Sequence, residues 1–366
     1  MPTVPSWNYR DEYEEEHEEI LQVIDRVFRS GRLILGEEVK LFENEFANFC
    51  ETSCSIGVAN GTDALFLALK ALGIGHEDEV ITVANTAIPT VSAIVSTGAI
   101  PKFADINNDD CLIDTSEIES LITTKTHCIL PVHLYGQCAQ MAEIMRIADQ
   151  NGLVVVEDCA QAHGATLNGK KAGSMGHAGA FSFYPTKVLG AYGDAGMVTC
   201  SDQALAERIR RLRVYGANEQ YYALEHGYNS RIDELHAAIL RHKLNRIDVY
   251  INRRRYLANR YDQALKNTSL ILPGILTERT HVYYLYTCRH PDRDALIAEL
   301  AGRGINLQIN YPTPIYRMPA YRHLGFSDND LPNTARACRE VFCLPLYPSL
   351  RIEQQDQVIE ALLETC

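Results

Sequence analysis

Short apolar runs alternate with helical patterns between residue 55 and about residue 200. Six of these runs are bounded by turn residues and predict buried strands. The predicted strands are Val80–Ala84, Ile100–Phe103, Cys128–Val132, Leu153–Val156, Ala180–Phe183 and Met197–Cys200. The helical patterns between them are Asp63–Leu72, Thr90–Ser96, Ser116–Ile122 and Met141–Gln150. This alternation predicts an α/β fold with a large, mostly parallel sheet that helices cover on both faces.

The pattern changes on either side of this region. Helical spacing of apolar residues predicts two helices before it and two after it. These helices are Asp11–Phe28, Glu38–Phe49, Asp202–Val214 and Ile232–Val249. Beyond residue 250 the pattern predicts a further helix and then the strand Val282–Cys288, the helix Arg293–Ala301, the strand Ile305–Ile309 and the helix Gln354–Leu363. We therefore expect a large domain over residues 1–250 and a smaller C-terminal α+β domain over residues 251–366.

Composition and charge narrow the class of protein. The 366 residues carry a formal net charge of -13, and this acidity disfavours nucleic acid and anionic membranes as partners. The start of the chain lacks an apolar signal core, and eleven cysteines without such a signal predict reduced thiols and a cytoplasmic protein. Cys50 and Cys54 have the spacing of half a zinc site, but no second close pair follows, so we expect no metal.

Three segments carry candidate chemistry, and the first is Asn60-Gly-Thr-Asp63 at the start of a helix. Unpaired N–H groups at a helix N-terminus bind phosphate, which makes Gly61 and Thr62 candidate phosphate ligands. The alternative interpretation is that Thr62 or Asp63 only caps the helix.

The second segment is Glu157-Asp158, at the carboxyl end of a predicted central strand. In open α/β sheets this end faces the ligand crevice, so a carboxylate there can pair with a cationic ring nitrogen. Gln161 and His163 follow closely and could reach the same ligand. The alternative is that Asp158 is a turn former or a helix cap.

The third segment places Lys187 beside a glycine-rich turn between two apolar strands, with almost no other charge nearby. A desolvated lysine amine can form a Schiff base, although a loop lysine that reaches solvent is the simpler alternative. Pyridoxal phosphate (PLP) requires such a lysine, an acid against its ring nitrogen and donors for its phosphate. Together the three segments predict a PLP enzyme.

Ten segments in order along the chain resemble the sugar aminotransferase family typified by the DegT, DnrJ, EryC and StrS proteins. They are Ser30–Gly36, Phe42–Phe46, Asn60–Leu65, Asp78–Ile81, Val132–Gln137, Glu157–Gly164, Ser182–Lys187, Gly227–Asp233, Tyr311–Pro314 and Leu344–Pro348. The resemblance covers nearly the whole chain. It implies fold type I of the PLP enzymes.

The resemblance also implies roles for individual residues. Lys187 matches the Schiff-base lysine, Asp158 the acid at the pyridine nitrogen, and Gln161 the partner of the ring hydroxyl. Gly61, Thr62 and Ser182 match the phosphate cradle. Asn229 matches a phosphate ligand donated by the other subunit, which implies a homodimer with shared active sites.

Two departures from the family pattern concern the substrate. Ala87 stands where many members have a ring-stacking aromatic, and this variant resembles the branch that aminates 3-keto sugars on a thymidine diphosphate carrier. Asn310 stands before Tyr311 where many members have histidine. In relatives this neighbourhood, together with a tyrosine at the place of Tyr184, touches the sugar.

The resemblance thus implies an aminotransferase that moves the amino group of L-glutamate to a nucleotide-linked keto sugar, most simply at C3 of a dTDP-3-keto-6-deoxyhexose. Such an enzyme would serve deoxyamino sugar and glycan synthesis, for example of lipopolysaccharide O-antigen. The alternatives are C4 amination of a dTDP- or UDP-linked 4-keto-6-deoxy sugar and a PLP-binding regulatory protein without turnover. A related dehydratase would carry histidine in place of Lys187.

Overall fold

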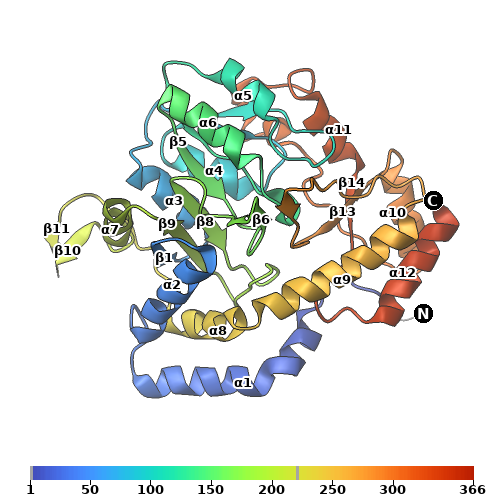
Figure 1. The fold of residues 1–366 in the computed structure, drawn as a ribbon, viewed down its shortest axis with the longest axis horizontal. Helices are drawn as coiled ribbons and strands as arrows, with labels where there is room; N and C mark the ends of the chain where they lie inside the picture. The colour runs from blue at the N-terminus through green and yellow to red at the C-terminus, as the bar shows by residue number, and fades with distance from the viewer. Residues whose placement is uncertain (1–2, 220–221) are drawn as a thin grey trace.

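A seven-stranded sheet forms the centre of the molecule in a computed structural model that describes residues 3–219 and 222–366 (Figure 1). The strand order is β1 (Cys54–Val58), β9 (Gly196–Cys200), β8 (Ala178–Ser182), β5 (Val154–Asp158), β4 (Thr126–Ile129), β2 (Glu79–Val83) and β3 (Ile100–Ala104). Only β9 runs antiparallel to its neighbours β1 and β8. The prediction of a mostly parallel sheet is confirmed, and each of the six predicted strands corresponds to one of these.

Helices cover both faces of this sheet. Strands β1 and β9 are buried at every position, and β2 and β5 at every position but the first. Because successive side chains point to opposite faces, continuous burial requires cover on both sides. The covering helices include α2 (Glu37–Cys50), α3 (Gly61–Ala71), α4 (Ile88–Ser96), α5 (Thr115–Leu121), α6 (Met141–Asn151) and α7 (Gln203–Leu212).

The C-terminal elements, to the right in Figure 1, form a second hydrophobic core. It is built from α9 (Ile247–Leu265), α10 (Arg293–Gly302), α12 (Ile352–Thr365) and the antiparallel pair β13 (Tyr286–Arg289) and β14 (Val341–Leu344). Helix α9 contributes Ile247 and Ile251 to the first core and Leu257 to the second. The predicted domain boundary near residue 250 falls inside this helix, and the division into two domains there stays a prediction.

The remaining elements lie around these two cores. They are α1 (Tyr9–Ser30), α8 (Glu234–Leu244), α11 (Pro332–Glu340), β6 (Thr166–Leu167), β7 (Lys170–Lys171), β10 (Ala217–Glu219), β11 (Tyr222–Ala223), β12 (Arg279–Thr280) and the 3-10 turns Leu134–Gly136, Ile315–Arg317 and Arg322–Leu324.

Two secondary-structure predictions are wrong. The single helix predicted over Ile232–Val249 begins later, because Asp233 caps the start of α8 through its side chain. It is also divided into α8 and α9, because the backbone leaves the helical conformation at Arg246. The strand predicted over Ile305–Ile309 is reduced to isolated bridges from Ile305 to Val4 and from Gln308 to Cys343. Cys343 lies in β14, a strand that the sequence pattern did not predict, and it also pairs with Thr287 of β13.

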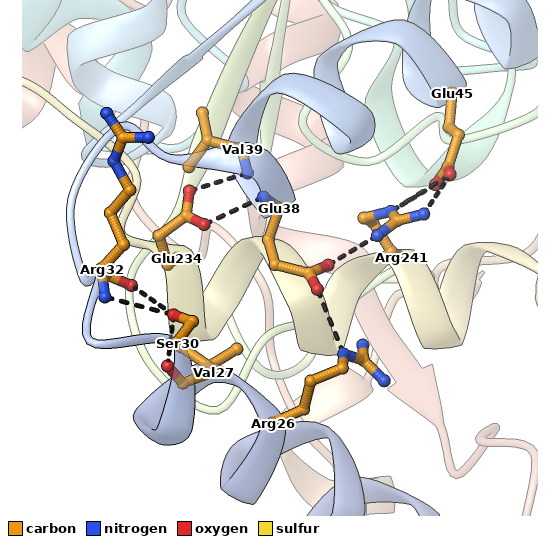
Figure 2. Close-up of polar contacts among 9 residues, drawn as sticks. All are labelled: Arg26, Val27, Ser30, Arg32, Glu38, Val39, Glu45, Glu234 and Arg241. Carbon is orange, nitrogen blue, oxygen red and sulfur yellow. Dashed lines mark hydrogen bonds and ion pairs between the residues drawn. The ribbon is translucent and has the colours of Figure 1, made fainter.

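A buried carboxylate fixes the start of α2 against α8 (Figure 2). Glu234 accepts hydrogen bonds from the backbone N–H groups of Glu38 and Val39, both at 2.9 Å (Figure 2). It accepts a third from the backbone N–H of Gly36 at 2.7 Å. Gly36 leaves room for this carboxylate, because a Cβ at this position would lie 2.7 Å from a Glu234 oxygen. Arg241 of α8 then bridges the side chain of Glu38 and that of Glu45, each at 2.6 Å.

This junction joins two segments that are distant in sequence. Glu234 donates its backbone N–H to Leu33 at 3.0 Å, and Ile34 forms a bridge with Asp233. Leu33 and Ile34 are about half exposed, at 51% and 48%. The junction therefore holds an exposed apolar loop beside the segment that contains Asn229.

Candidate active site

The carboxyl ends of β5 and β8 and the N-terminus of α3 open onto one pocket of about 230 Å³. Seven residues predicted from the sequence line it together: Gly61, Thr62, Asp158, Gln161, Ser182, Tyr184 and Lys187. A larger hollow of about 710 Å³ lies beside the edge strand β3, but none of the predicted site residues lines it. The ligand crevice expected at the carboxyl edge of the sheet is therefore where the candidate chemistry gathers.

The start of α3 presents free N–H groups to this pocket. Asn60 caps the helix, and its Oδ1 accepts from the Asp63 backbone at 2.8 Å. The sequence-based alternative, in which Thr62 or Asp63 is the cap, is therefore wrong, because the cap lies two residues before Thr62. In the described part of the chain the N–H groups of Gly61 and Thr62 have no protein acceptor. A helix N-terminus with unused donors is suited to an anion.

Gly61 permits a close approach between α3 and β8. A Cβ at this position would lie 2.6 Å from the Cβ of Ser182, so any larger residue would push the helix start away from the strand end. Ser182, the last residue of β8, thereby lies beside the free N–H groups. The hydroxyl and the two amides form a cradle of suitable chemistry for a phosphate group.

Asp158 is buried at the end of the central strand β5. Its Oδ2 accepts from the hydroxyl of Thr90 at 2.8 Å, and its Oδ1 accepts from the backbone N–H of Ala160 at 3.1 Å. The second contact is that of a turn former, so the simpler interpretation of this residue is also partly realised. Burial raises the pKa of Asp158, while these hydrogen bonds and the charge of Lys187 oppose the rise.

Thr90 was missed as a site residue by the sequence analysis. It lines the pocket together with Ala87 and Pro89 at the start of α4. Its own hydroxyl is paired with that of Thr86 at 2.8 Å. The Asn85–Thr90 motif was recognised, but its sequence could not reveal that Thr90 of α4 donates to Asp158 at the end of β5.

The side chain of the neighbouring Glu157 points away from the pocket, toward the loop of residues 173–176. It is fully buried and accepts from the backbone N–H groups of Gly173, Met175 and Gly176 at 2.9, 2.8 and 2.6 Å. His133 Nε2 lies 2.8 Å from Glu157 Oε2, the oxygen that also accepts from Gly173. Glu157 therefore organises the loop after β7 and does not line the pocket.

One cluster in the described ranges 3–219 and 222–366 has the spacing of a metal site: His133, Glu157 and Cys159. His133 Nδ1 already accepts from the Ala139 backbone at 3.0 Å, which leaves the proton on Nε2, facing Glu157. The ligand atoms of this cluster are thus engaged in protein hydrogen bonds. Cys50 and Cys54, the sequence-based half-site, are both free and buried.

Gln161 is oriented by two contacts. Its Oε1 accepts from the backbone N–H of Tyr135 at 2.7 Å, and its Nε2 donates to the hydroxyl of Tyr311 at 2.7 Å. The amide group has a second hydrogen that remains available to a ligand in the pocket. Tyr311 is thereby linked to the site through Gln161, although it does not line the pocket.

Lys187 lies in the turn between β8 and β9, and its backbone N–H donates to Tyr184 at 2.8 Å. Its side chain is half-buried and lines the pocket. Gly190 closes this turn, since a Cβ there would lie 2.5 Å from the Pro185 carbonyl oxygen. The predicted setting of Lys187, a tight glycine-containing turn between two buried strands, is present in the structure.

Besides Tyr311, three further predicted residues lie outside the pocket lining. Asn229 is exposed and forms a bridge with Val214. Asn310 is half-buried, and its Oδ1 lies 3.7 Å from Cys343 Sγ. His163 is buried between the rings of Phe181 and Phe183, and burial lowers its pKa to about 3.

The residues in the pocket fit PLP. The cradle at Gly61 suits the phosphate, Asp158 offers a carboxylate for a ring nitrogen, Gln161 has a free N–H for a ring hydroxyl, and Lys187 has an amine. Fold and pocket together define the class of protein as a PLP-dependent aminotransferase of fold type I.

Comparison with known proteins gives the family. The family model described as the DegT/DnrJ/EryC1/StrS aminotransferase family matches residues 14–363, and the chain belongs to this family. It is a nucleotide-sugar transaminase by its similarity to curated relatives. The dTDP-3-amino-3,4,6-trideoxy-alpha-D-glucose transaminase of Micromonospora megalomicea subsp. nigra is 49% identical over 98% of this chain and 97% of the relative. A pleiotropic regulatory protein of Geobacillus stearothermophilus is 43% identical over 99% and 98%.

Two solved structures agree with this assignment. The crystal structure of S. venezuelae DesV in complex with a ketimine intermediate has a TM-score of 0.98 and 42% identity, and the match covers 100% of this chain and 99% of that one. The structure of NtdA from Bacillus subtilis with bound cofactor PMP has a TM-score of 0.92 and 30% identity, and the match covers 100% and 85%.

None of the helices that the structure describes is long and apolar enough to cross a membrane.

Proposed function

We propose that the chain transfers the amino group of L-glutamate to C3 of a dTDP-linked 3-keto-6-deoxyhexose. The observation that carries the proposal is the single pocket that unites Lys187, Asp158 and the free N-terminus of α3. The dTDP sugar transaminases of Micromonospora, Streptomyces venezuelae and Aneurinibacillus thermoaerophilus, at 49%, 42% and 42% identity, have names that place the amino group at C3. Glutamate as the donor rests on the resemblance to the family.

Each pocket residue has a proposed task. The amides of Gly61 and Thr62 and the hydroxyl of Ser182 bind the phosphate of the cofactor. Asp158 keeps a proton on the ring nitrogen, and the hydrogen bond from Thr90 fixes the orientation of its carboxylate. Gln161 donates its free N–H to the ring hydroxyl. Tyr184, which is 52% exposed at the mouth of the pocket, contacts the sugar together with the Asn310–Tyr311 neighbourhood.

PLP supplies a carbonyl carbon that takes up the amino group and a ring that withdraws electrons from the adjacent carbon. Lys187 would hold the cofactor through Nζ until the amino donor takes its place. The free Nζ would then accept the proton from the α-carbon of glutamate and donate it to the carbon of the cofactor that takes up the amino group. The same residue performs the two proton transfers in reverse order for the keto sugar, which leaves with the amino group.

A panel of substrates tests the position of amination. We expect the purified enzyme with glutamate to aminate dTDP-linked 3-keto-6-deoxy sugars, observed by mass spectrometry as the mass change from ketone to amine. Matched dTDP- and UDP-linked 4-keto-6-deoxy sugars are the controls. Amination of the 4-keto sugars alone would contradict the C3 assignment and favour the alternative of C4 amination. This comparison is necessary because Ala87 and Asn310, the two departures from the family pattern, concern the substrate.

The functional unit is proposed to be a homodimer with shared sites. Asn229 is exposed and lies outside the pocket lining of its own chain, although the next residue, Ser230, donates to Asp63 of α3 at 2.6 Å. The exposed apolar residues Leu33 and Ile34 lie beside this segment, as a subunit contact would require. In this arrangement Asn229 donates to the phosphate in the partner's pocket.

Subunit exchange tests the shared site. One hydrogen bond to a charged phosphate contributes roughly 1.5–3 kcal/mol, so Asn229→Ala would be only partly impaired and the bulkier Asn229→Trp serves as the inactive parent. We expect inactive Lys187→Ala and Asn229→Trp chains to regain activity when mixed, because one site of each heterodimer carries both substitutions and the other carries neither. A hybrid without activity, after exchange is shown by mass spectrometry, would place Asn229 outside the partner's site.

The cellular role is proposed from the same similarity. The product is a deoxyamino sugar nucleotide for a surface glycan such as O-antigen, and the spore coat polysaccharide biosynthesis protein SpsC of Bacillus subtilis is 36% identical to this chain. All eleven cysteines are free, which suits a reducing cytoplasm.

A further inference from the structure

The amine of Lys187 lies over the face of an aromatic ring that the sequence analysis did not single out. Lys187 Nζ is 4.5 Å from the centroid of the Tyr284 ring. Within residues 3–219 and 222–366, no carboxylate lies within ion-pair distance of this amine. The face of an aromatic ring carries partial negative charge, so the Tyr284 ring attracts a cation at this position.

Two residues, Thr186 and Arg254, hold Tyr284 in place through its hydroxyl and its backbone. The Tyr284 hydroxyl lies 3.1 Å from Thr186 Oγ1, next to Lys187 in the same turn. The buried Arg254 donates to the backbone carbonyls of Tyr283 and Tyr284 at 3.2 and 3.3 Å. Tyr284 itself is only 9% exposed.

The backbone before the ring is strained. Tyr283 has a φ of +50°, in the left-handed region that non-glycine residues rarely adopt. Such a conformation persists only when its surroundings fix it, and Arg254 supplies that support from α9. The structure thus maintains an unfavourable backbone conformation at the residue that precedes the Tyr284 ring.

We propose that Tyr284 is a catalytic residue that holds the protonated amine of Lys187 after its release from the cofactor. In each half-reaction Lys187 Nζ gains one proton from carbon and gives one proton to carbon, so a transient ammonium exists between the two transfers. The ring face stabilises that ammonium without forming a bond that must be broken. This inference deepens the proposed function, because it rests on the assignment of Lys187 as the proton carrier.

The first test uses the full chain without cofactor. Each lysine is labelled with a small amine-reactive reagent at fixed pH, and the rate at each position is read by peptide mass spectrometry. The reagent reacts with the neutral amine, and the Tyr284 ring stabilises the ammonium form of Lys187. Tyr284→Leu should therefore speed labelling of Lys187 by roughly 3- to 30-fold. Tyr284→Phe keeps the ring and should stay within about twofold of wild type. Lys171, 4.2 Å above the Phe49 ring, is the internal reference and should not change.

A second variant separates electrostatics from shape. Pentafluorophenylalanine at position 284 keeps the volume of a ring but removes the negative face, so it should label like Tyr284→Leu and fold like Tyr284→Phe. In the loaded enzyme, Tyr284→Leu and the fluorinated ring should both lower kcat by roughly 3- to 30-fold and raise the isotope effect with α-deuterated glutamate. Lys187 labelling equal in all four proteins, with an unchanged isotope effect, would overturn the proposal. Labelling needs no turnover, so this failure is distinct from failure of the Lys187 assignment, which Lys187→Ala tests.

Discussion

Replacement of Lys187 by alanine should abolish transamination while the protein still folds. The side chain lies in a closed turn between β8 and β9 and is only half-buried, so its loss creates no large core cavity. The loss of a group that carries the proton in both half-reactions should lower kcat by at least ~10²–10⁴-fold. The free helix N-terminus of α3 and the carboxylate of Asp158 remain, so the variant should still bind PLP or its amine form without a covalent bond.

Borohydride reduction and turnover measure this outcome together. Reduction should fix the cofactor covalently to Lys187 in the wild type and leave Lys187→Ala unlabelled, as read by the mass of the intact chain. Lys171→Ala is the matched control, because that lysine also lies over an aromatic ring but does not line the pocket. Turnover of Lys187→Ala within tenfold of wild type would contradict the assignment.

Replacement of Asp158 by asparagine should lower turnover by several powers of ten. A neutral amide cannot stabilise a protonated ring nitrogen, so electron withdrawal from the reacting carbon weakens. Folding should not suffer, because burial raises the pKa of Asp158 and the ionised carboxylate therefore costs the cofactor-free protein stability at neutral pH. The amide carries no such cost. The cofactor-free variant should melt no lower than wild type.

Glu157 provides the matched control for this experiment. It is the adjacent carboxylate, yet it accepts three backbone hydrogen bonds away from the pocket. Glu157→Gln should lower the free energy of unfolding by about 1–3 kcal/mol and leave the pH dependence of the bound cofactor's absorbance in place. Near-normal kinetics for Asp158→Asn would mean that Asp158 is only a turn residue and that the partner of the ring nitrogen lies elsewhere.

Much of the fold could be predicted from the alternation of short apolar runs and helical patterns. The runs around Val155 and Phe181 are continuous because both faces of the sheet are covered, and such runs are readable in a sequence. The C-terminal part was less predictable. Strand β14 pairs with β13 across more than fifty intervening residues, and no local pattern fixes such a pairing.

Some residues of the site could be predicted from the sequence, and others could not. Lys187, Asp158 and Gly61 could be predicted, because each lies at a junction of strand, turn and helix that has a local signature. Thr90 and Tyr284 could not, because their importance comes from contacts with Asp158 and Lys187 that are distant in sequence. The cap of α3 also required the structure, since Asn60, Thr62 and Asp63 are all residues that cap helices.

The most direct measurement of the central claim follows the nitrogen atom itself. Wild-type enzyme with bound PLP is incubated with ¹⁵N-labelled glutamate and a dTDP-linked 3-keto-6-deoxyhexose, and the product is examined by NMR while the cofactor absorbance is recorded. The proposed function predicts ¹⁵N bonded to C3 of the sugar, a cofactor band that changes on addition of glutamate and returns with the keto sugar, and neither effect in Lys187→Ala. A cofactor band that stays unchanged with both substrates, and no ¹⁵N in any keto sugar of the panel, would contradict the proposed function and favour a regulatory protein that only binds PLP.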